Sequence, residues 1–309
     1  MTTYELVVER REPVADGVLA LVLRQPGGGP LPGWEPGAHI DVLLAPGLER
    51  QFSLCGDPAD RYRWRIAVLR EPDGRGGSAY AHTKVRQGTR LRVRGPRNHF
   101  ALEPAPRYRF VAGGIGITPI LPMLTAAERA GAEWTLLYGG RTRASMAFTE
   151  ELSRYGERVA LRPRDQAGPL DLGPVTTGLP EGTLVYCCGP GGLLDAMAER
   201  CPPGALRVER FHPARRQEGH GGEFEVVLAR TGRTVTVPAD VSVLDAVRAV
   251  GVAVLYSCAE GTCGTCETDV VEGAVDHRDS VLTPDERAAG DTMMICVSRC
   301  RGRRLVLDL

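Results

Sequence analysis

Three cysteines fall within nine residues near the C-terminal end of the chain, in the stretch C-A-E-G-T-C-G-T-C at residues 258–266. Thiol side chains this close in sequence converge on one centre only if the backbone turns sharply and irregularly. Gly261 and Gly264 lie within the stretch, and glycine readily adopts the left-handed backbone angles that such a loop requires. The spacing therefore predicts a tight loop that is neither helix nor strand, with the rest of the domain folded around it.

A fourth cysteine completes a recognisable pattern. Cys258, Cys263 and Cys266 follow the spacing C-x4-C-x2-C, and Cys296 comes after 29 intervening residues. This is the plant-type ferredoxin spacing for a 2Fe-2S cluster. Structural zinc usually takes two separate cysteine pairs, and no second pair follows here. We predict a 2Fe-2S cluster on these four residues, with a zinc site or ordinary small cysteines as the alternatives.

Cys300 competes with Cys296 for the fourth position. Cys296 follows the apolar residues Met293–Ile295, as suits a buried ligand, whereas Cys300 lies between arginines. We therefore predict Cys296. The remaining cysteines are expected to be ordinary small residues: Cys55, Cys187, Cys201 and Cys300.

Length and composition limit the possible classes of protein. The chain has 309 residues, and about 150 residues per domain suggests two or three domains. Its net charge is zero, so charge gives no argument for nucleic acid or a membrane as partner. The N-terminus has no apolar signal region, and no apolar run approaches the ~20 residues that span a bilayer. We expect a cytoplasmic protein, in which disulfides are disfavoured.

The pattern of apolar runs, turns and periodic stretches divides the chain into four segments. Residues 1–104 hold many short apolar or alternating runs between turns, which predicts an antiparallel β-barrel. Residues 105–213 alternate apolar strands, glycine turns and helices, which predicts a parallel α/β sheet. Residues 214–222 have no periodicity and are predicted to be a linker. Residues 223–309 form the cysteine-containing domain.

The expected elements follow from these runs. In the first two segments we expect the strands 18–24, 39–44, 63–69, 90–94, 110–112, 134–138 and 184–188, and the helices 119–129, 145–155 and 193–200. In the last segment we expect a hairpin over 224–237 turning at Thr231–Gly232, a helix over 243–250 and a final strand over 304–309.

Two glycine turns have the composition of phosphate sites. F-V-A-G-G-I-G-I-T-P places glycines between a strand and a helix, where backbone N–H groups and the helix dipole suit a pyrophosphate. In G-R-G-G-S, residues 74–78, Ser78 is predicted to cap a helix while neighbouring N–H groups receive a phosphate. A plain tight turn explains either motif alone.

The run R-Q-F-S-L, residues 50–54, adds side chains that suit a flat phosphorylated cofactor. In a strand Arg50 and Phe52 share one face and Ser53 points the other way. An arginine fork suits phosphate and an aromatic ring suits a flat ring system. Taken alone, each residue has an ordinary explanation: Arg50 as a surface arginine and Phe52 as a core phenylalanine.

Together these motifs are specific. R-Q-F-S-L, G-R-G-G-S, G-G-I-G-I-T-P, Y-G-G-R-T-R-A-S, Y-C-C-G-P, E-R-F and the plant-type cysteine spacing occur in one order along almost the whole chain. In this the chain resembles the phthalate dioxygenase reductase group of the ferredoxin–NADP reductase superfamily. The resemblance implies a multidomain fold: an FMN-binding β-barrel, an NAD(P)-binding α/β domain with a parallel sheet, and an α+β ferredoxin domain of β-grasp type.

The resemblance also implies roles for individual residues. A flavin site would include Arg50, Gln51, Phe52, Ser53, Gly76, Gly77 and Ser78, with Glu209 and Phe211 closing it. A pyridine nucleotide would lie along Gly113, Gly114, Gly116, Thr118, Arg141, Arg143 and Cys188. Ser53, Cys188 and Phe211 would stand nearest the reacting rings. The sequence departs from the family pattern at Phe52, where the family has tyrosine, and at Cys187, which doubles the motif cysteine.

The implied activity is electron transfer by an NAD(P)H-dependent flavin iron–sulfur oxidoreductase. A nicotinamide delivers two electrons as hydride, a 2Fe-2S cluster accepts one, and a flavin handles both. Plant-type clusters lie near about −400 mV, which suits delivery to a terminal oxygenase, either Rieske-type or a haem-thiolate monooxygenase. We expect FMN rather than FAD, NADH rather than NADPH, and a monomer. The alternatives are a diaphorase or flavin reductase, and a non-catalytic ferredoxin-type carrier.

Overall fold

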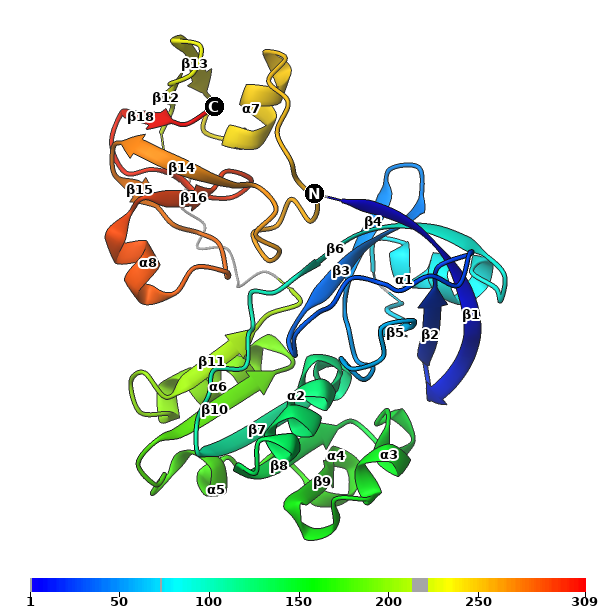
Figure 1. The fold of residues 1–309 in the computed structure, drawn as a ribbon. Coiled ribbons are helices and arrows are strands. Elements are labelled where there is room, and N and C mark those ends of the chain that lie inside the picture. Colours follow the sequence, from blue (N-terminus) through cyan, green and yellow to red (C-terminus); the bar gives the residue numbers. More distant parts are fainter. Residues whose placement is uncertain (1, 73, 213–221) are drawn as a thin grey trace. The chain divides into compact units, whose positions relative to one another are not determined.

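The computed structural model describes residues 2–72, 74–212 and 222–309, which form two compact units, Met1–Glu209 and Arg210–Leu309. Each unit has its own sheets and its own hydrophobic core (Figure 1). The predicted linker, residues 214–222, lies outside the described residues except for Gly222.

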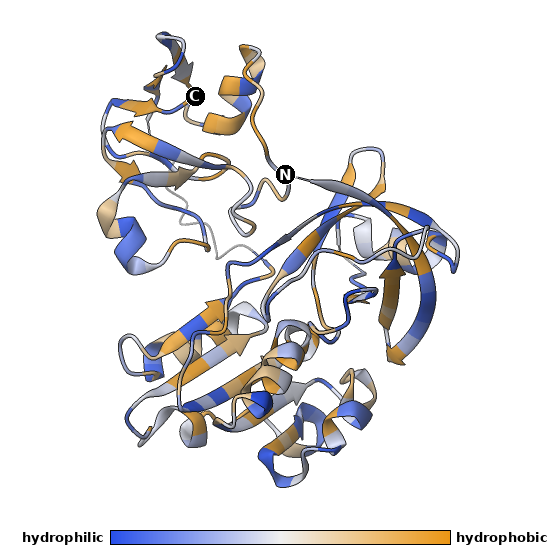
Figure 2. Ribbon diagram, viewed as in Figure 1, coloured by the Kyte–Doolittle hydropathy of each residue, from blue (hydrophilic) through white to orange (hydrophobic). Residues whose placement is uncertain are grey.

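The N-terminal part of the first unit is a six-stranded antiparallel sheet in the order β4-β3-β6-β1-β2-β5. A bridge between Leu54 and Ile66 joins the two edges, so that the sheet closes on itself as a barrel. Strand β2 is hydrophobic and buried along nearly its whole length (Figure 2). The elements are β1 Thr3–Ala15, β2 Val18–Arg24, β3 His39–Ala45, β4 Leu48–Ser53, β5 Trp64–Leu69, α1 Gly77–Lys84 and β6 Arg90–Arg97.

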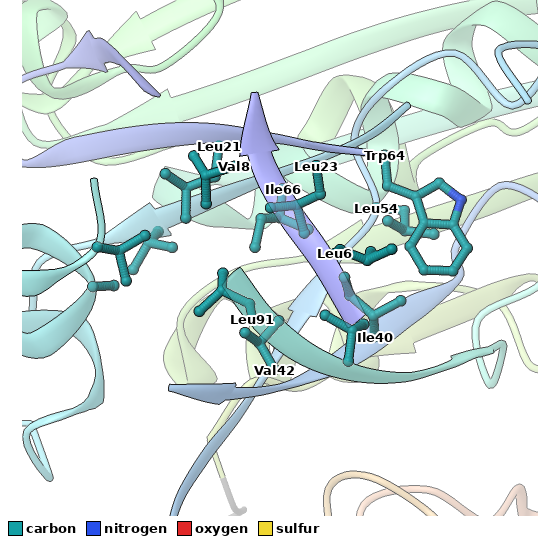
Figure 3. Packing of buried hydrophobic residues seen from close by; sticks show 14 of the residues in the cluster. Leu6, Val8, Leu21, Leu23, Ile40, Val42, Leu54, Trp64, Ile66 and Leu91 are labelled. Carbon is teal, nitrogen blue, oxygen red and sulfur yellow. The ribbon is translucent and has the colours of Figure 1, made fainter. Parts of the chain in front are cut away.

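The barrel is filled mainly by apolar side chains of β1, β2, β3, β5 and β6, and Phe52 of β4 packs against them. Leu6, Leu23, Ile40, Trp64 and Ile66 are each 1% exposed or less and form one packed cluster (Figure 3). In a strand alternate side chains point to opposite faces, so residues between these inward positions point out of the barrel. This alternation decides which side chains are available to neighbouring parts of the unit.

The rest of the first unit is a five-stranded parallel sheet in the order β11-β10-β7-β8-β9. Its central strand β7 is buried, as is typical of a parallel sheet between helices. The elements are β7 Arg107–Gly113, η1 Gly114–Gly116, α2 Ile117–Arg129, β8 Glu133–Gly140, η2 Arg143–Ser145, α3 Thr149–Ser153, η3 Gly156–Arg158, β9 Val159–Pro163, α4 Arg164–Ala167, α5 Gly173–Thr176, β10 Thr183–Cys188, α6 Gly191–Arg200 and β11 Leu206–Glu209.

One predicted helix is wrong in this region. Residues 145–155 were expected to form one helix, but the structure has only η2 and the five-residue α3. Phe148 adopts a left-handed backbone conformation, with φ of 62°. A residue in that conformation does not continue a right-handed helix, and the chain therefore breaks between the two short segments.

The second unit carries a mixed sheet in the order β13-β12-β18-β14-β16 and a separate two-stranded ladder, β15-β17. The expected hairpin is confirmed: the N–H groups of Thr231 and Gly232 both donate to the carbonyl of Leu228. The elements are β12 Phe224–Leu228, β13 Arg233–Val237, α7 Val243–Ala249, β14 Glu267–Glu272, β15 Val275–Asp276, α8 Pro284–Ala289, β16 Thr292–Met294, β17 Arg299–Cys300 and β18 Arg304–Leu307.

The predicted fold class is confirmed, with an antiparallel barrel, a parallel α/β sheet and an α+β unit in that order. The residue boundaries that the sequence assigned to the domains stay a prediction. Among the described residues no helix is long and apolar enough to cross a bilayer.

Removing a core side chain tests the barrel. Ile66→Ala should lower the free energy of unfolding of the first unit by about 2–5 kcal/mol, because it removes buried methylene groups and leaves a cavity. All three tryptophans lie in this unit, so their fluorescence during urea unfolding reports its stability. Tyr62→Ala is the control, since Tyr62 is 55% exposed and should change stability by no more than about 0.5 kcal/mol. Equal losses in both variants would contradict the assigned core.

Candidate functional site

The cysteine stretch forms the irregular loop that its spacing predicts. Ala259, Gly261 and Gly264 have left-handed φ angles of 56°, 73° and 70°. At Gly261 a Cβ atom would lie 2.6 Å from the side chain of Val297 and 3.0 Å from the Cα of Asp279. The loop therefore packs against the following segment so closely that only glycine fits at this position.

The four predicted ligands come together in this loop. The Cys258 thiol lies beside those of Cys263 and Cys296, and the Cys266 thiol also lies beside that of Cys296. These contacts lower the pKa of Cys258 and Cys266 and raise that of Cys263 and Cys296, because neighbouring thiols share protons. Such a group of sulfur atoms fits a cluster that takes four thiolates.

Backbone N–H groups surround these sulfur atoms. Those of Glu260 and Thr262 lie 3.3 and 3.5 Å from Cys258 Sγ, and that of Thr265 lies 3.4 Å from Cys263 Sγ. Donors of this kind stabilise thiolates and tune a cluster that they surround. Within the part of the chain that the structure describes, no three His, Cys, Asp or Glu side chains enclose a single metal ion. A 2Fe-2S cluster has two irons with two cysteines each, so it does not require such a group.

Cys300, the competing fourth ligand, makes different contacts. Its sulfur accepts the N–H of Gly302 at 3.2 Å and donates to the carbonyl of Arg304 at 3.3 Å, within the β17 turn. Cys296, by contrast, contacts two of the other cysteines. The geometry thus agrees with the choice of Cys296.

Strand ends from the two sheets of the first unit bring Ser53, Cys188 and Glu209 together. Ser53 ends β4, while Cys188 and Glu209 are paired neighbours at the ends of β10 and β11, with Cys188 Sγ 3.9 Å from Glu209 Oε2. The nearby Ser53 hydroxyl lowers the pKa of Glu209, but burial has the larger, opposite effect and raises that pKa to about 8. Burial also raises the pKa of Cys188. Burial thus favours the uncharged form of both the Cys188 thiol and the Glu209 carboxyl.

The Ser53 hydroxyl fits a bound flavin. Ser53 is 5% exposed, and its hydroxyl interacts with the neighbouring Glu209 carboxyl. A hydroxyl has one donor and two acceptor sites, so Ser53 keeps the capacity to bond a ligand polar atom as well. The flavin expected from the sequence would supply one.

The phosphate turn of the barrel lies against Arg50. Arg50 donates to the carbonyls of Glu49 at 2.7 Å and Arg75 at 2.6 Å, and a Cβ on Gly77 would lie 2.5 Å from the Arg50 side chain. Gly76 is the N-cap of α1, with φ of 79°. The arginine, the glycine turn and a helix N-terminus thus adjoin one another, as a phosphate site requires.

The expected helix cap at Ser78 is wrong. Helix α1 begins at Gly77, so Ser78 lies inside the first turn. Its hydroxyl instead accepts the N–H of Glu71 at 3.0 Å and ties the loop to the helix. The other two residues of the β4 motif face barrel residues: Gln51 Nε2 donates to Asp41 Oδ1 at 2.9 Å, and Phe52 is half-buried against the barrel core.

The second glycine turn packs directly on the end of β10. A Cβ on Gly116 would lie 2.2 Å from the carbonyl oxygen of Cys188, and one on Gly113 would lie 2.7 Å from Pro190 Cδ. Thr118 is buried and donates to the carbonyl of Ile115 at 2.9 Å. The turn after β7 and the end of β10 both lie at the carboxyl ends of parallel strands, the usual ligand-binding edge of such a sheet.

Three further predicted residues and one missed residue complete the description. Arg141 and Arg143 are exposed directly after β8, at the same carboxyl edge of the sheet. Phe211 is half-buried and belongs to the second unit. Tyr138 was taken only as a strand residue, yet its hydroxyl donates to the carbonyl of Gly114 at 3.1 Å and supports the turn. A tyrosine near the end of an otherwise buried strand was the available signal.

Comparison with known proteins agrees with this architecture. Residues 226–301 match the family described as 2Fe-2S iron-sulfur cluster binding domain, and residues 110–167 match the oxidoreductase NAD-binding domain. The phenoxybenzoate dioxygenase subunit beta of Ectopseudomonas oleovorans is 47% identical over 96% of this chain and 94% of its own length. The phthalate 4,5-dioxygenase oxygenase reductase subunit of Pseudomonas putida is 39% identical over 98% of this chain and 96% of its own length.

Two solved structures extend the comparison. The structure of a phthalate dioxygenase reductase matches with a TM-score of 0.73 and 36% identity, covering 99% of this chain and 98% of that chain. An intact type IV self-sufficient cytochrome P450 monooxygenase matches with a TM-score of 0.94 and 46% identity. That alignment covers 99% of this chain but 41% of the P450 chain.

Fold and site together define an NAD(P)H-dependent flavin iron–sulfur oxidoreductase. The chain belongs to the phthalate dioxygenase reductase group of the ferredoxin–NADP reductase superfamily. Its relatives include reductase subunits of oxygenase systems.

The fourth cluster ligand is tested by two serine variants. Cys296→Ser should lose the visible absorbance and the EPR signal of the reduced cluster, because Cys296 contacts two of the other three cysteines. Cys300→Ser is the matched control and should keep both signals, since its sulfur bonds only within its own turn. Loss of both signals in Cys300→Ser, with both kept in Cys296→Ser, would assign the ligand to Cys300.

The raised pKa of Glu209 predicts a pH dependence of the flavin-free protein. In the folded state the pKa is about 8, against an ordinary value of 4.5. Between these values the unfolded carboxyl is ionised and the folded one is protonated, so the free energy of unfolding should fall as pH rises from about 4.5 to about 8. Glu209→Gln should remove this slope in urea unfolding curves measured at several pH values. Glu199→Gln, at an exposed residue of α6, should keep it, and an unchanged slope in the Glu209 variant would contradict the assignment.

Proposed function

We propose that this chain passes electrons from NADH through FMN to a 2Fe-2S cluster and onward to a separate terminal oxygenase. The observation that carries this proposal is a combination within one chain. The Cys258–Cys266 loop brings its three thiols together with that of Cys296. A separate site gathers Ser53, Cys188 and Glu209 at strand ends of the barrel and the nucleotide sheet. One electron path would then run through three domains of this chain. These are the FMN barrel 1–104, the nucleotide domain 105–213 and the ferredoxin domain 223–309.

The residues have separate tasks in this scheme. When bound, a flavin supplies chemistry that accepts a hydride and releases electrons singly. Arg50 and the N–H groups of Gly76, Gly77 and Ser78 would hold its phosphate, and Ser53 would direct its hydroxyl to a ring nitrogen. Burial keeps Cys188 and Glu209 uncharged, so they present no fixed charge where hydride would transfer. Hydride transfer needs close and oriented reactants, so the task of these residues is positioning.

The position of the phosphate turn favours FMN over FAD. Gly76 and Gly77 belong to the barrel itself and adjoin Arg50, so a mononucleotide can end there. FAD is the alternative. Release of the flavin by acid and chromatography against both standards decides between them.

The acceptor is proposed from the relatives. Named relatives include a toluene-4-sulfonate monooxygenase system reductase subunit of Comamonas testosteroni, besides the dioxygenase components above. The P450 structure places a similar segment in one chain with a monooxygenase. We propose a Rieske-type or haem-thiolate oxygenase as the partner of this chain, with the reductase itself a monomer.

An anaerobic titration tests the electron path. NADH or NADPH is added to the purified protein while visible absorbance and low-temperature EPR are recorded. Bleaching at substoichiometric reductant with the rhombic EPR signal of a reduced cluster would support the proposal. Flavin bleaching with an EPR-silent, oxidised cluster would favour a diaphorase instead. A protein with a cluster but no retained flavin would favour a simple electron carrier.

The choice of nicotinamide predicts the effect of removing two arginines. Arg141 and Arg143 are exposed after β8, and arginines at this position can accept a 2′-phosphate. If NADH is the native donor, Arg141→Ala and Arg143→Ala should leave the ratio of kcat/KM for NADH and NADPH unchanged. A large loss with NADPH alone would overturn this choice and assign NADPH.

A further inference from the structure

Arg65 connects the barrel to helix α3 of the nucleotide-binding part. It lies on β5 between Trp64 and Ile66, both of which point into the barrel core (Figure 3). Because side chains alternate along a strand, the Arg65 side chain points out of the barrel. It is 26% exposed, so most of its surface is covered by other parts of the protein.

Both ends of the Arg65 guanidinium are used. On one side Nε and Nη2 donate to the carbonyl of Cys55 at 3.0 and 2.5 Å. On the other side Nη1 and Nη2 donate to the carboxylate of Glu151 in α3 at 2.9 and 3.2 Å. The Cζ atom also lies 4.8 Å from the centre of the Phe148 ring. These simultaneous hydrogen bonds on both sides require the planar guanidinium of arginine, whose N–H donors are held in a fixed geometry.

On the barrel side Arg65 holds the segment that carries Ser53. Cys55 comes two residues after Ser53, and its N–H donates to the carbonyl of Arg65 at 2.8 Å. The main chain and the side chain of Arg65 thus both bind Cys55. The position of the buried Ser53 hydroxyl depends on this short segment.

On the nucleotide side Arg65 holds the segment that follows Arg143. Phe148 is 7% exposed and keeps a left-handed φ of 62°, a conformation that is uncommon for a bulky residue and persists only when its surroundings fix it. The N–H of Asp16 in the barrel donates to the carbonyl of Ala144 in the same segment at 2.8 Å. Residues 144–151 are therefore bound to the barrel at two points.

A second ion pair links the same two parts of the unit and serves as a comparison. Arg129 of α2 pairs with Asp57 of the barrel at 3.0 Å, but these side chains are 55% and 49% exposed. Exposed pairs of this kind contribute little. The Arg65 contacts are better covered, bidentate on the carboxylate and supported by an aromatic ring.

We propose that Arg65 is a positioning residue for hydride transfer. It sets the segment bearing Ser53 against the nucleotide-binding sheet through Cys55, Glu151 and Phe148. The inference rests on the proposed function, because it assigns to Arg65 the alignment of nicotinamide and flavin. Arg65 acts through its contacts to Cys55, Glu151 and Phe148.

Rapid anaerobic mixing of the holoprotein with NADH tests this role. Arg65→Ala should lower the limiting rate of flavin reduction about 10-fold or more, since small misplacements of the reactants are costly, while the Kd for NADH changes less than about twofold. Flavin content and the EPR signal of the dithionite-reduced cluster should stay at wild-type levels. Arg65→Lys should remain slow, because an ammonium group does not reproduce the fork. Arg129→Ala is the control and should reduce flavin at the wild-type rate.

A second variant, Glu151→Gln, tests the role of Arg65 if Arg65→Ala does not retain flavin. The Glu151 substitution leaves the contacts between Arg65 and Cys55 within the barrel intact. It should also slow flavin reduction at unchanged Kd, and in a stable double variant the two effects should not multiply. Wild-type rates in Glu151→Gln, or a loss confined to NADH affinity, would overturn the inference. Failure of the wild-type protein itself to be reduced by either nucleotide would instead overturn the proposed function.

Discussion

The first unit depends on the close approach of the glycine turn after β7 to the end of β10. Gly116 lies so near the carbonyl of Cys188 that a methyl group would overlap it. This approach draws two neighbouring strand ends together and leaves their N–H groups and side chains at one edge of the sheet. Cys188 and Glu209 stand at that edge, and the barrel contributes Ser53 to the same place. Binding and chemistry therefore follow from a backbone contact that only glycine permits.

The second unit depends on a comparable constraint. Gly261 packs against Asp279 and Val297, and the loop that it allows carries three of the four cysteines. The fourth, Cys296, is brought to the loop because β14, which follows the loop, pairs with β16, which precedes Cys296. In both units a glycine lets the backbone approach a neighbour, and the functional side chains are those that this approach leaves together.

How far the sequence predicted the protein differs between local and long-range features. The hairpin at Thr231–Gly232, the barrel strands β2, β3, β5 and β6 and the cysteine loop were predicted, because their signals lie within a few residues, whereas the long strand β1 was not predicted. The helix expected over 145–155 was wrong, since its periodicity did not reveal that Phe148 would take a left-handed conformation. The cap expected at Ser78 failed for a similar reason, because Glu71 offered its hydroxyl a competing partner.

The sequence by itself determined the order of the three domains, the cysteine quartet and the glycine turns, because each is a short pattern of residue types with fixed spacing. Tertiary structure alone decided which distant residues meet. It places Ser53 beside Glu209, supports the Gly114 turn with Tyr138, and joins Arg65 to Glu151. These pairs lie from 24 to 156 residues apart, and no local propensity encodes their approach. Packing of the barrel against the parallel sheet brings together Ser53 with Glu209 and Arg65 with Glu151, and the pairing of β7 with β8 brings Tyr138 to Gly114.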